Sequence, residues 1–227
     1  PVHYSVALEA SARHSEGNWE GLPITDEARA VLDDYHTSIL DAGVMPSPNC
    51  LSIEQHGRLF IINYPGGSRL NRTIGMIITA MLSAKSGYKV GYQFDPYRII
   101  LDAPTRTTVK DMLAIMKGFE TGIAGLLRFS IRDSPALQSQ SLRAARKMGG
   151  RGREADVDSF GMGRLSEAYQ DTPLHTEGIE RFLFHQLDEE GMEEFIEKIN
   201  SGEISVVLSP KTPHGYAGLD PYRDYLK

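Results

Sequence analysis

The chain has 227 residues, of which 41% are hydrophobic and 24% charged, and its formal net charge is −6. These values are typical of a globular protein that buries a sizeable core, in one domain or in two small ones. The longest apolar run, residues 74–82, is too short to cross a bilayer, and no signal-peptide pattern opens the chain. The single cysteine, Cys50, excludes an internal disulfide and indicates a reducing, cytoplasmic setting. Because the chain begins with Pro1 rather than Met, we expect a fragment or a processed product.

The first quarter of the chain has the patterns of two helices and two strands. Composition favours a weak helix over residues 3–14, and Thr25 caps a second helix that continues to about residue 40 and stops at Gly43. The apolar residues at helical spacing in this second helix are Ala28, Val31, Leu32, Tyr35 and Ile39. Residues 51–55 and 59–64 read as two strands around a His56-Gly57 turn.

The middle of the chain has the clearest helical pattern, over residues 72–85, with Asn71 as its expected N-cap and Gly87 as its end. Two strands follow at 89–94 and 97–101, and then a short helix to about residue 117, capped by Thr107 or Thr108. Alternation along the second strand places Tyr97 on the face of the apolar residues that follow it, so we expect it to be buried rather than available for base stacking.

The C-terminal half is mostly helical by pattern. We expect helices over residues 123–131, 135–148, 173–187 and 188–201, followed by a strand over 203–208. Glycine-rich residues 149–163 have the composition of a flexible linker. The fold class predicted is α+β, with a small mixed or antiparallel sheet packed with helices. The chain is interpreted as a single domain over 1–227, with possible lobes 1–133 and 134–227.

Charge is distributed unevenly along the chain. Residues 51–153 hold 16 basic and 6 acidic side chains, whereas residues 1–50 and 154–227 have net charges of −6 and −10. A basic middle between acidic flanks is a candidate surface for binding a polyanion. The alternative is that acidic residues of the flanks neutralise this region in the fold.

The Gly66-Gly67 turn before the central helix is the strongest local candidate site. Glycines permit a tight turn, and backbone N–H groups at a helix start, with the charges of Arg69 and Arg72, suit a phosphate. Arg98, on the strand after Asp95-Pro96, is placed to reach this turn. The alternative is an ordinary strand-to-helix turn whose arginines pair with Glu54 or Asp95.

A second basic feature lies on the predicted helix 135–148. Arg143, Arg146 and Lys147 share one helix face, and Arg151 extends it into the glycine-rich segment. We call these four residues the basic ridge. It has the form of a salt-sensitive contact to a nucleic-acid backbone, and a solvated helix face is the alternative.

Motifs of catalysis are absent from this sequence. It contains no GxxxxGK[ST] phosphate loop, no HExxH metal motif and no GxSxG nucleophile turn. No catalytic or metal-binding residue is therefore predicted. A small enzyme that binds an anion at the Gly-Gly turn stays as a minor alternative, without a convincing nucleophile or base.

Several sequence blocks together resemble a known family. The stretches GSRLNRTIG (67–75) and DPYRIIL (95–101) resemble a turn-and-helix and a strand of the C-terminal accessory domain of large-helicase-related (Lhr) superfamily 2 helicases, also called the DEAD/H-associated region. Further blocks in the same order are PVHYSVA (1–7), DTP (171–173), LDEEGM (187–192) and SGEI (201–204). The match departs at 136–141, ALQSQS, where many members have aromatic and arginine residues, and at the tail 212–218, TPHGYAG.

The resemblance implies a larger polypeptide in which two RecA-like domains and a winged helix precede this chain. Such enzymes couple ATP hydrolysis to 3′-to-5′ movement on single-stranded DNA and unwind DNA or RNA–DNA duplexes. ATP and Mg²⁺ would bind those upstream domains, and no cofactor is expected in this chain.

The sequence thus predicts a non-catalytic accessory domain that contacts single-stranded DNA or RNA and braces the motor domains. The predicted contacts are Arg69, Asn71, Arg72, Arg98, Arg143, Arg146, Lys147 and Arg151. The alternative is a docking module whose charges serve contacts between domains and which does not itself touch nucleic acid.

Overall fold

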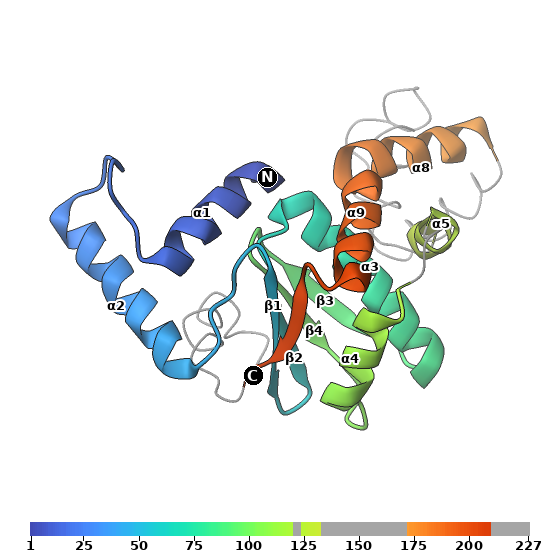
Figure 1. Ribbon diagram of the computed structural model, residues 1–227. Helices are drawn as coiled ribbons and strands as arrows, with labels where there is room; N and C mark the ends of the chain where they lie inside the picture. Colours follow the sequence, from blue (N-terminus) through green and yellow to red (C-terminus); the bar gives the residue numbers. More distant parts are fainter. Residues whose placement is uncertain (120–123, 133–171, 210–227) are drawn as a thin grey trace, which may run out of the picture. The chain divides into compact units, whose positions relative to one another are not determined.

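The computed structural model describes residues 1–119, 124–132 and 172–209, and Figure 1 traces them. The chain divides into two compact units, one formed by residues 1–121 and 191–227 and the other by residues 122–190. The predicted helix 135–148, the glycine-rich segment 149–163 and the tail after residue 209 lie outside the described residues.

A five-stranded mixed sheet forms the centre of the first unit. Its strands are β1 (Cys50–His56), β2 (Leu59–Asn63), β3 (Gly91–Phe94), β4 (Arg98–Asp102) and β5 (Ser205–Leu208). The order is β3-β4-β2-β1-β5, and only the β1–β5 pair is parallel. The α+β class is therefore confirmed, and the last strand closes one edge of the sheet beside β1 (Figure 1).

Helix α3 (Gly67–Ser86) covers one face of this sheet and supplies much of the core. Ile74, Ile77 and Ile78 are fully buried along its inner face. Gly75 lies against the sheet, where an added Cβ would stand 2.5 Å from the Tyr92 ring and 3.1 Å from Ile99. The close approach of helix and sheet therefore depends on the missing side chain at this position.

Two further helices pack in the first unit. The capping box of α4 (Val109–Lys117) joins Thr108 and Asp111, which confirms Thr108 as the cap. The expected inner face of α9 (Glu189–Ser201) is buried, and the Phe195 ring lies 4.9 Å from the ring of Tyr64. These contacts tie the C-terminal helix to the end of β2.

Helices α1 (Tyr4–Glu16) and α2 (Asp26–Ala42) form an N-terminal pair. They end at left-handed glycines, Gly17 and Gly43, as the sequence predicts for Gly43. Between them, the Trp19 indole donates to Asp33 at 2.7 Å. The predicted apolar face of α2 is only partly correct: Ile39 is 2% exposed, but Val31 is 69% exposed.

The second unit contains α5 (Ala124–Arg132) and α8 (Pro173–Gln186), both predicted from the pattern. Leu127 and Ile131 of α5 and Phe182 and Leu183 of α8 are buried. The two helices are in contact and share an ion pair of 2.7 Å between Arg128 and Glu180. No helix in the described ranges is long and apolar enough to span a membrane.

Candidate functional site

The Gly-Gly turn is built around a buried amide. Helix α3 begins at Gly67, so Asn71 is not its N-cap; Gly66 holds that position and makes no side-chain cap bond. Asn71 is fully buried, and its Nδ2 donates to the carbonyl oxygens of Tyr64 at 3.0 Å and Asp95 at 2.9 Å. The prediction that Asn71 caps the helix is wrong, because the helix begins four residues earlier and the side-chain amide donates to these two carbonyl oxygens.

The side-chain oxygen of Asn71 explains why position 66 is a glycine. An added Cβ on Gly66 would lie 2.4 Å from Asn71 Oδ1, so a side chain there would collide with the amide. Among the described residues Oδ1 has no hydrogen-bond partner. Asn71 therefore positions the turn from inside and does not face a ligand in solution.

Two backbone N–H groups at this helix start already have acceptors. Gly67 donates to the carbonyl of Pro96 at 2.9 Å, and Ser68 donates to the carbonyl of Val2 at 3.0 Å. Ser68 Oγ in turn accepts from the Val2 N–H at 2.9 Å. These two N–H groups hold the N-terminal segment and the β3–β4 turn, so they do not form the phosphate cradle proposed from the sequence.

The three arginines around the turn differ in their surroundings. Arg69 is exposed, whereas the Arg72 guanidinium lies 5.6 Å from the centre of the Phe94 ring. Burial raises the pKa of Tyr92, and the hydrogen-bonded Arg72 charge partly opposes that rise. Arg98 binds Asp95 Oδ2 through both Nε and Nη2 at 3.0 Å, so this arginine is held by a local ion pair.

The Asp95 side chain also shapes the β3–β4 turn. Its Oδ1 accepts from the Tyr97 N–H at 2.8 Å, and the Tyr97 carbonyl accepts from the Tyr64 N–H at 2.9 Å. Tyr97 is 39% exposed, so the prediction of burial is wrong. Strand β4 begins one residue later, at Arg98, and the alternation used for that prediction does not reach Tyr97.

A buried polar group lies on the sheet face opposite α3, and sequence reasoning missed it. Asn63 Nδ2 donates to Glu54 Oε1 at 2.7 Å and to Ser52 Oγ at 3.1 Å, and Glu54 is 1% exposed. The register places Arg98 opposite Asn63 on this face. Polar residues alternating within an apolar strand were the available signal. The contacts satisfy buried polar groups and orient the strands.

Tyr35 of α2 lies near this polar group. Burial is the main cause that raises the pKa of its phenol, the nearby Arg98 charge lowers it, and Glu54 raises it. The Tyr35 phenol is therefore within electrostatic range of Arg98 and Glu54.

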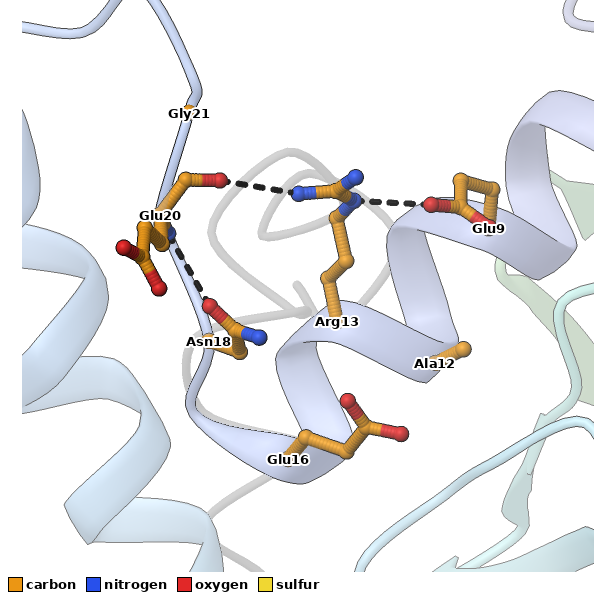
Figure 2. A pocket seen from close by; sticks show the side chains of 7 residues that line it. All are labelled: Glu9, Ala12, Arg13, Glu16, Asn18, Glu20 and Gly21. Carbon is orange, nitrogen blue, oxygen red and sulfur yellow. Dashed lines mark hydrogen bonds and ion pairs between the residues drawn. The ribbon is translucent and has the colours of Figure 1, made fainter.

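A hollow of about 360 Å³ lies beside α1. Figure 2 shows the residues that line it, none of which was selected from the sequence. Arg13 donates to Glu9 at 2.8 Å and to the carbonyl of Glu20 at 3.2 Å, and the Glu20 N–H donates to Asn18 at 3.0 Å. These bonds fasten the loop after α1 to the helix. Within the described ranges, no group of three or more acidic, histidine or cysteine side chains is placed to hold a metal ion.

The basic ridge lies outside the described residues, so its assignment stays a prediction. The four predicted contacts at the turn, in contrast, are brought together by the structure. Asn71 and Arg98 both bind Asp95, and Arg69 and Arg72 occupy the first turns of α3. The turn is a packed junction of three chain segments that presents one exposed arginine to solvent.

Comparison with known proteins identifies the family to which this chain belongs. The family described as DEAD/H associated matches residues 45–214, which include β1 to β5 and both blocks of the turn. The chain therefore belongs to the DEAD/H-associated family, and the resemblance seen in the sequence is confirmed at this level.

The structure is similar to that of the helicase Lhr from Mycobacterium smegmatis, solved bound to ssDNA and AMP-PNP. The TM-score is 0.74 at 15% sequence identity, over 96% of this chain and 31% of that chain. The chain thus has the fold of about a third of that helicase. Comparison with curated protein sequences finds no match.

Proposed function

We propose that the chain is the accessory domain of an Lhr-like, ATP-dependent 3′-to-5′ helicase. In this role it contacts the backbone of single-stranded DNA or RNA and braces the motor domains, which bind ATP and Mg²⁺. The observation that carries the proposal is the fold shared over 96% of the chain with a helicase solved on single-stranded DNA. Membership of the DEAD/H-associated family supports the same assignment.

The proposed contacts have unequal support at the turn. Arg69 is exposed and its side chain reaches solvent from the first turn of α3. Asn71, Arg72 and Arg98 are less exposed than Arg69 and contact other residues of the junction, so their proposed contribution is to hold it in place. The basic ridge, Arg143 to Arg151, supplies the larger number of candidate phosphate contacts.

Binding of single-stranded DNA at several salt concentrations tests this proposal. We expect an Arg143→Ala/Arg146→Ala/Lys147→Ala variant to bind a labelled oligonucleotide more weakly than wild type. The slope of log K against log salt should fall by about 2, because each lost phosphate contact on a single strand contributes about 0.7. Arg69→Ala removes one proposed contact, so it should lower this slope by no more than about 0.7.

Arg181→Ala is the matched control, because this exposed arginine pairs with Glu177 on α8 and belongs to no proposed contact. It should retain the wild-type affinity and slope. Equal binding by the ridge variant, Arg69→Ala and wild type would contradict the proposed backbone contact.

A docking module is the second candidate, and the internal pairing of the turn favours it. Asn71 and Arg98 contact the protein itself, as a structural junction requires. This alternative predicts that the isolated chain binds single strands weakly at low salt, while removal of the chain from its parent polypeptide lowers the ATPase rate. Strong, salt-sensitive binding by the isolated chain would contradict it.

A further inference from the structure

One end of the first unit carries exposed cations around an exposed aromatic ring. Tyr88 follows the end of α3 and is 71% exposed. Lys89 is its neighbour, and Arg106 and Lys110 lie before and at the start of α4; all three are exposed. We call these four residues the Tyr88 surface. None of them belongs to the turn or to the basic ridge.

The link that carries Tyr88 is fixed by hydrogen bonds on both sides. Gly87 ends α3 at φ 73°, and its N–H donates to the Ser83 carbonyl at 2.9 Å. The Tyr88 N–H donates to Ser86 Oγ at 3.2 Å, and the Val90 N–H donates to Ser83 Oγ at 3.0 Å. The backbone is thus held in place while the phenol ring remains in solvent.

The two loops of this surface lie at the same end of the sheet. Gly91, where β3 begins, pairs with Asp102, where β4 ends. Lys85, near the end of α3, forms an ion pair of 2.5 Å with Asp111 in the first turn of α4. Figure 1 shows the end of α3, the β4–α4 loop and the β1–β2 hairpin along this edge.

The carboxylates at this end are engaged by other cations. Asp102 binds Arg58, and Asp111 binds Lys85 and closes the capping box with Thr108. The Lys85 ammonium and the Thr108 groups hold the pKa of Asp111 well below its usual range. In the described part of the chain, Lys89, Arg106 and Lys110 have no carboxylate partner. Three exposed cations therefore lie on the two loops at this end of the sheet, in addition to those that the carboxylates pair with.

We infer that the Tyr88 surface binds single-stranded nucleic acid, with a base stacked on the Tyr88 ring and neighbouring phosphates bound by Lys89, Arg106 and Lys110. An exposed aromatic ring among cations has the chemistry of a single-strand groove, in which stacking accepts any base and cations follow the backbone. The inference rests on the proposed function, and it adds a site separate from the turn and the ridge.

An acidic protein is the competing ligand, and the surface is less suited to it. The residues next to Tyr88 and Arg106 in the sequence are Gly87, Lys89, Thr105 and Thr107, none of which has a large apolar side chain. Protein interfaces place their aromatic anchors in desolvated pockets surrounded by such contacts. Stacking on a base needs only one open face of the ring.

The full chain is tested with a labelled oligothymidylate of about a dozen nucleotides, within the range of single-strand site sizes. We expect Tyr88→Ala to weaken binding about tenfold and Tyr88→Phe to bind within about twofold of wild type, because the phenyl ring still stacks. Lys89→Ala/Arg106→Ala/Lys110→Ala should lower the salt slope by about 2. Lys117→Ala, an exposed cation at the far end of α4, should leave both quantities unchanged.

Each contrary result has a separate meaning. Wild-type binding by Tyr88→Ala overturns the inference, whether or not the triple variant loses affinity. Competition by polyglutamate as strong as that by unlabelled oligonucleotide also overturns it, in favour of an acidic protein. If the ridge variant loses binding while the Tyr88 variants do not, this inference fails and the proposed function stands. If wild type binds no single strand at low salt, both fail.

Discussion

Asn71 Nδ2 and the Asp95 carbonyl oxygen lie 2.9 Å apart, and this bond joins the start of α3 to the β3–β4 turn. The same Nδ2 holds the end of β2 through the Tyr64 carbonyl. One buried amide thus ties the β3–β4 turn to the chain segment that runs from the end of β2 into α3. The conspicuous Gly-Gly block owes its residues to this packing, and Arg69 is the part of it that faces solvent.

Replacing Asn71 should therefore destabilise the fold. We expect Asn71→Ala to lower the free energy of unfolding by about 2–4 kcal/mol, because the carbonyls of Tyr64 and Asp95 both lose their donor in a buried site. Urea denaturation followed by circular dichroism measures this change. The control Arg69→Ala removes an exposed side chain and should shift the value by less than about 0.5 kcal/mol. Equal midpoints for Asn71→Ala and wild type would refute the structural role.

Gly75→Ala should also destabilise the protein, for a steric reason. The added Cβ would lie 2.5 Å from the Tyr92 ring, so α3 must move away from the sheet. Overpacking of this kind costs about 1–3 kcal/mol. Gly91→Ala is the matched control, since an added Cβ there has no atom within 4 Å. Thermal melts of both variants check the difference, and a Gly75→Ala protein as stable as Gly91→Ala would argue against the close packing.

Phe195 should anchor α9 to the core of the first unit. Its ring is 1% exposed and lies 4.9 Å from Tyr64 and 6.4 Å from Phe119. We expect Phe195→Ala to cost about 3–5 kcal/mol through lost burial and a residual cavity. Glu193→Ala, exposed on the same helix, should change stability little. Chemical denaturation measures both, and a loss below about 1 kcal/mol for Phe195→Ala would contradict this packing.

Asp111 should contribute stability that depends on pH. Its pKa is depressed in the folded protein, first by the Lys85 hydrogen bond and then by Thr108. The contribution is therefore present above the unfolded pKa of about 3.9 and is lost as the pH falls below it toward the folded pKa. We expect Asp111→Asn to be less stable than wild type by about 0.5–1 kcal/mol at pH 6, from the lost ion pair and helix-start charge.

The difference between Asp111→Asn and wild type should shrink when urea midpoints are measured at about pH 3, because protonation then removes the carboxylate from the wild type as well. Glu193→Gln, an exposed carboxylate on α9, is the comparison variant. A constant difference at both pH values would contradict the assigned cause.

Local sequence signals predicted helix starts and ends correctly where the contacts that fix them lie within a few residues. Thr108 caps α4 through its own backbone and Asp111, three residues away, and Gly43 and Gly87 end their helices by adopting positive φ. Those signals lie within one turn of chain and are readable without the fold. The family blocks were readable for the same reason, because their order is a property of the sequence.

The errors occurred where partners come from distant segments. Asn71 is a residue type that often caps helices, but here its side-chain amide donates to the carbonyl oxygens of Tyr64 and Asp95. Val31 has helical spacing with Ile39, but in the folded chain it is 69% exposed. The Tyr88 surface was missed because its residues are spread over 88–110, and only the pairing of β3 with β4 brings their two loops to the same end of the sheet.

By itself, the sequence determined the α+β class, most helix ends, the absence of a phosphate loop and the membership of the DEAD/H-associated family. Only the tertiary structure decided which charged and polar groups face solvent. It placed Asn71 and Glu54 in the core, paired Arg98 with Asp95 and left Tyr88 open among cations. The physical reason is that helix propensity and capping act over a few residues, whereas burial and ion pairing depend on segments that meet only in the folded chain.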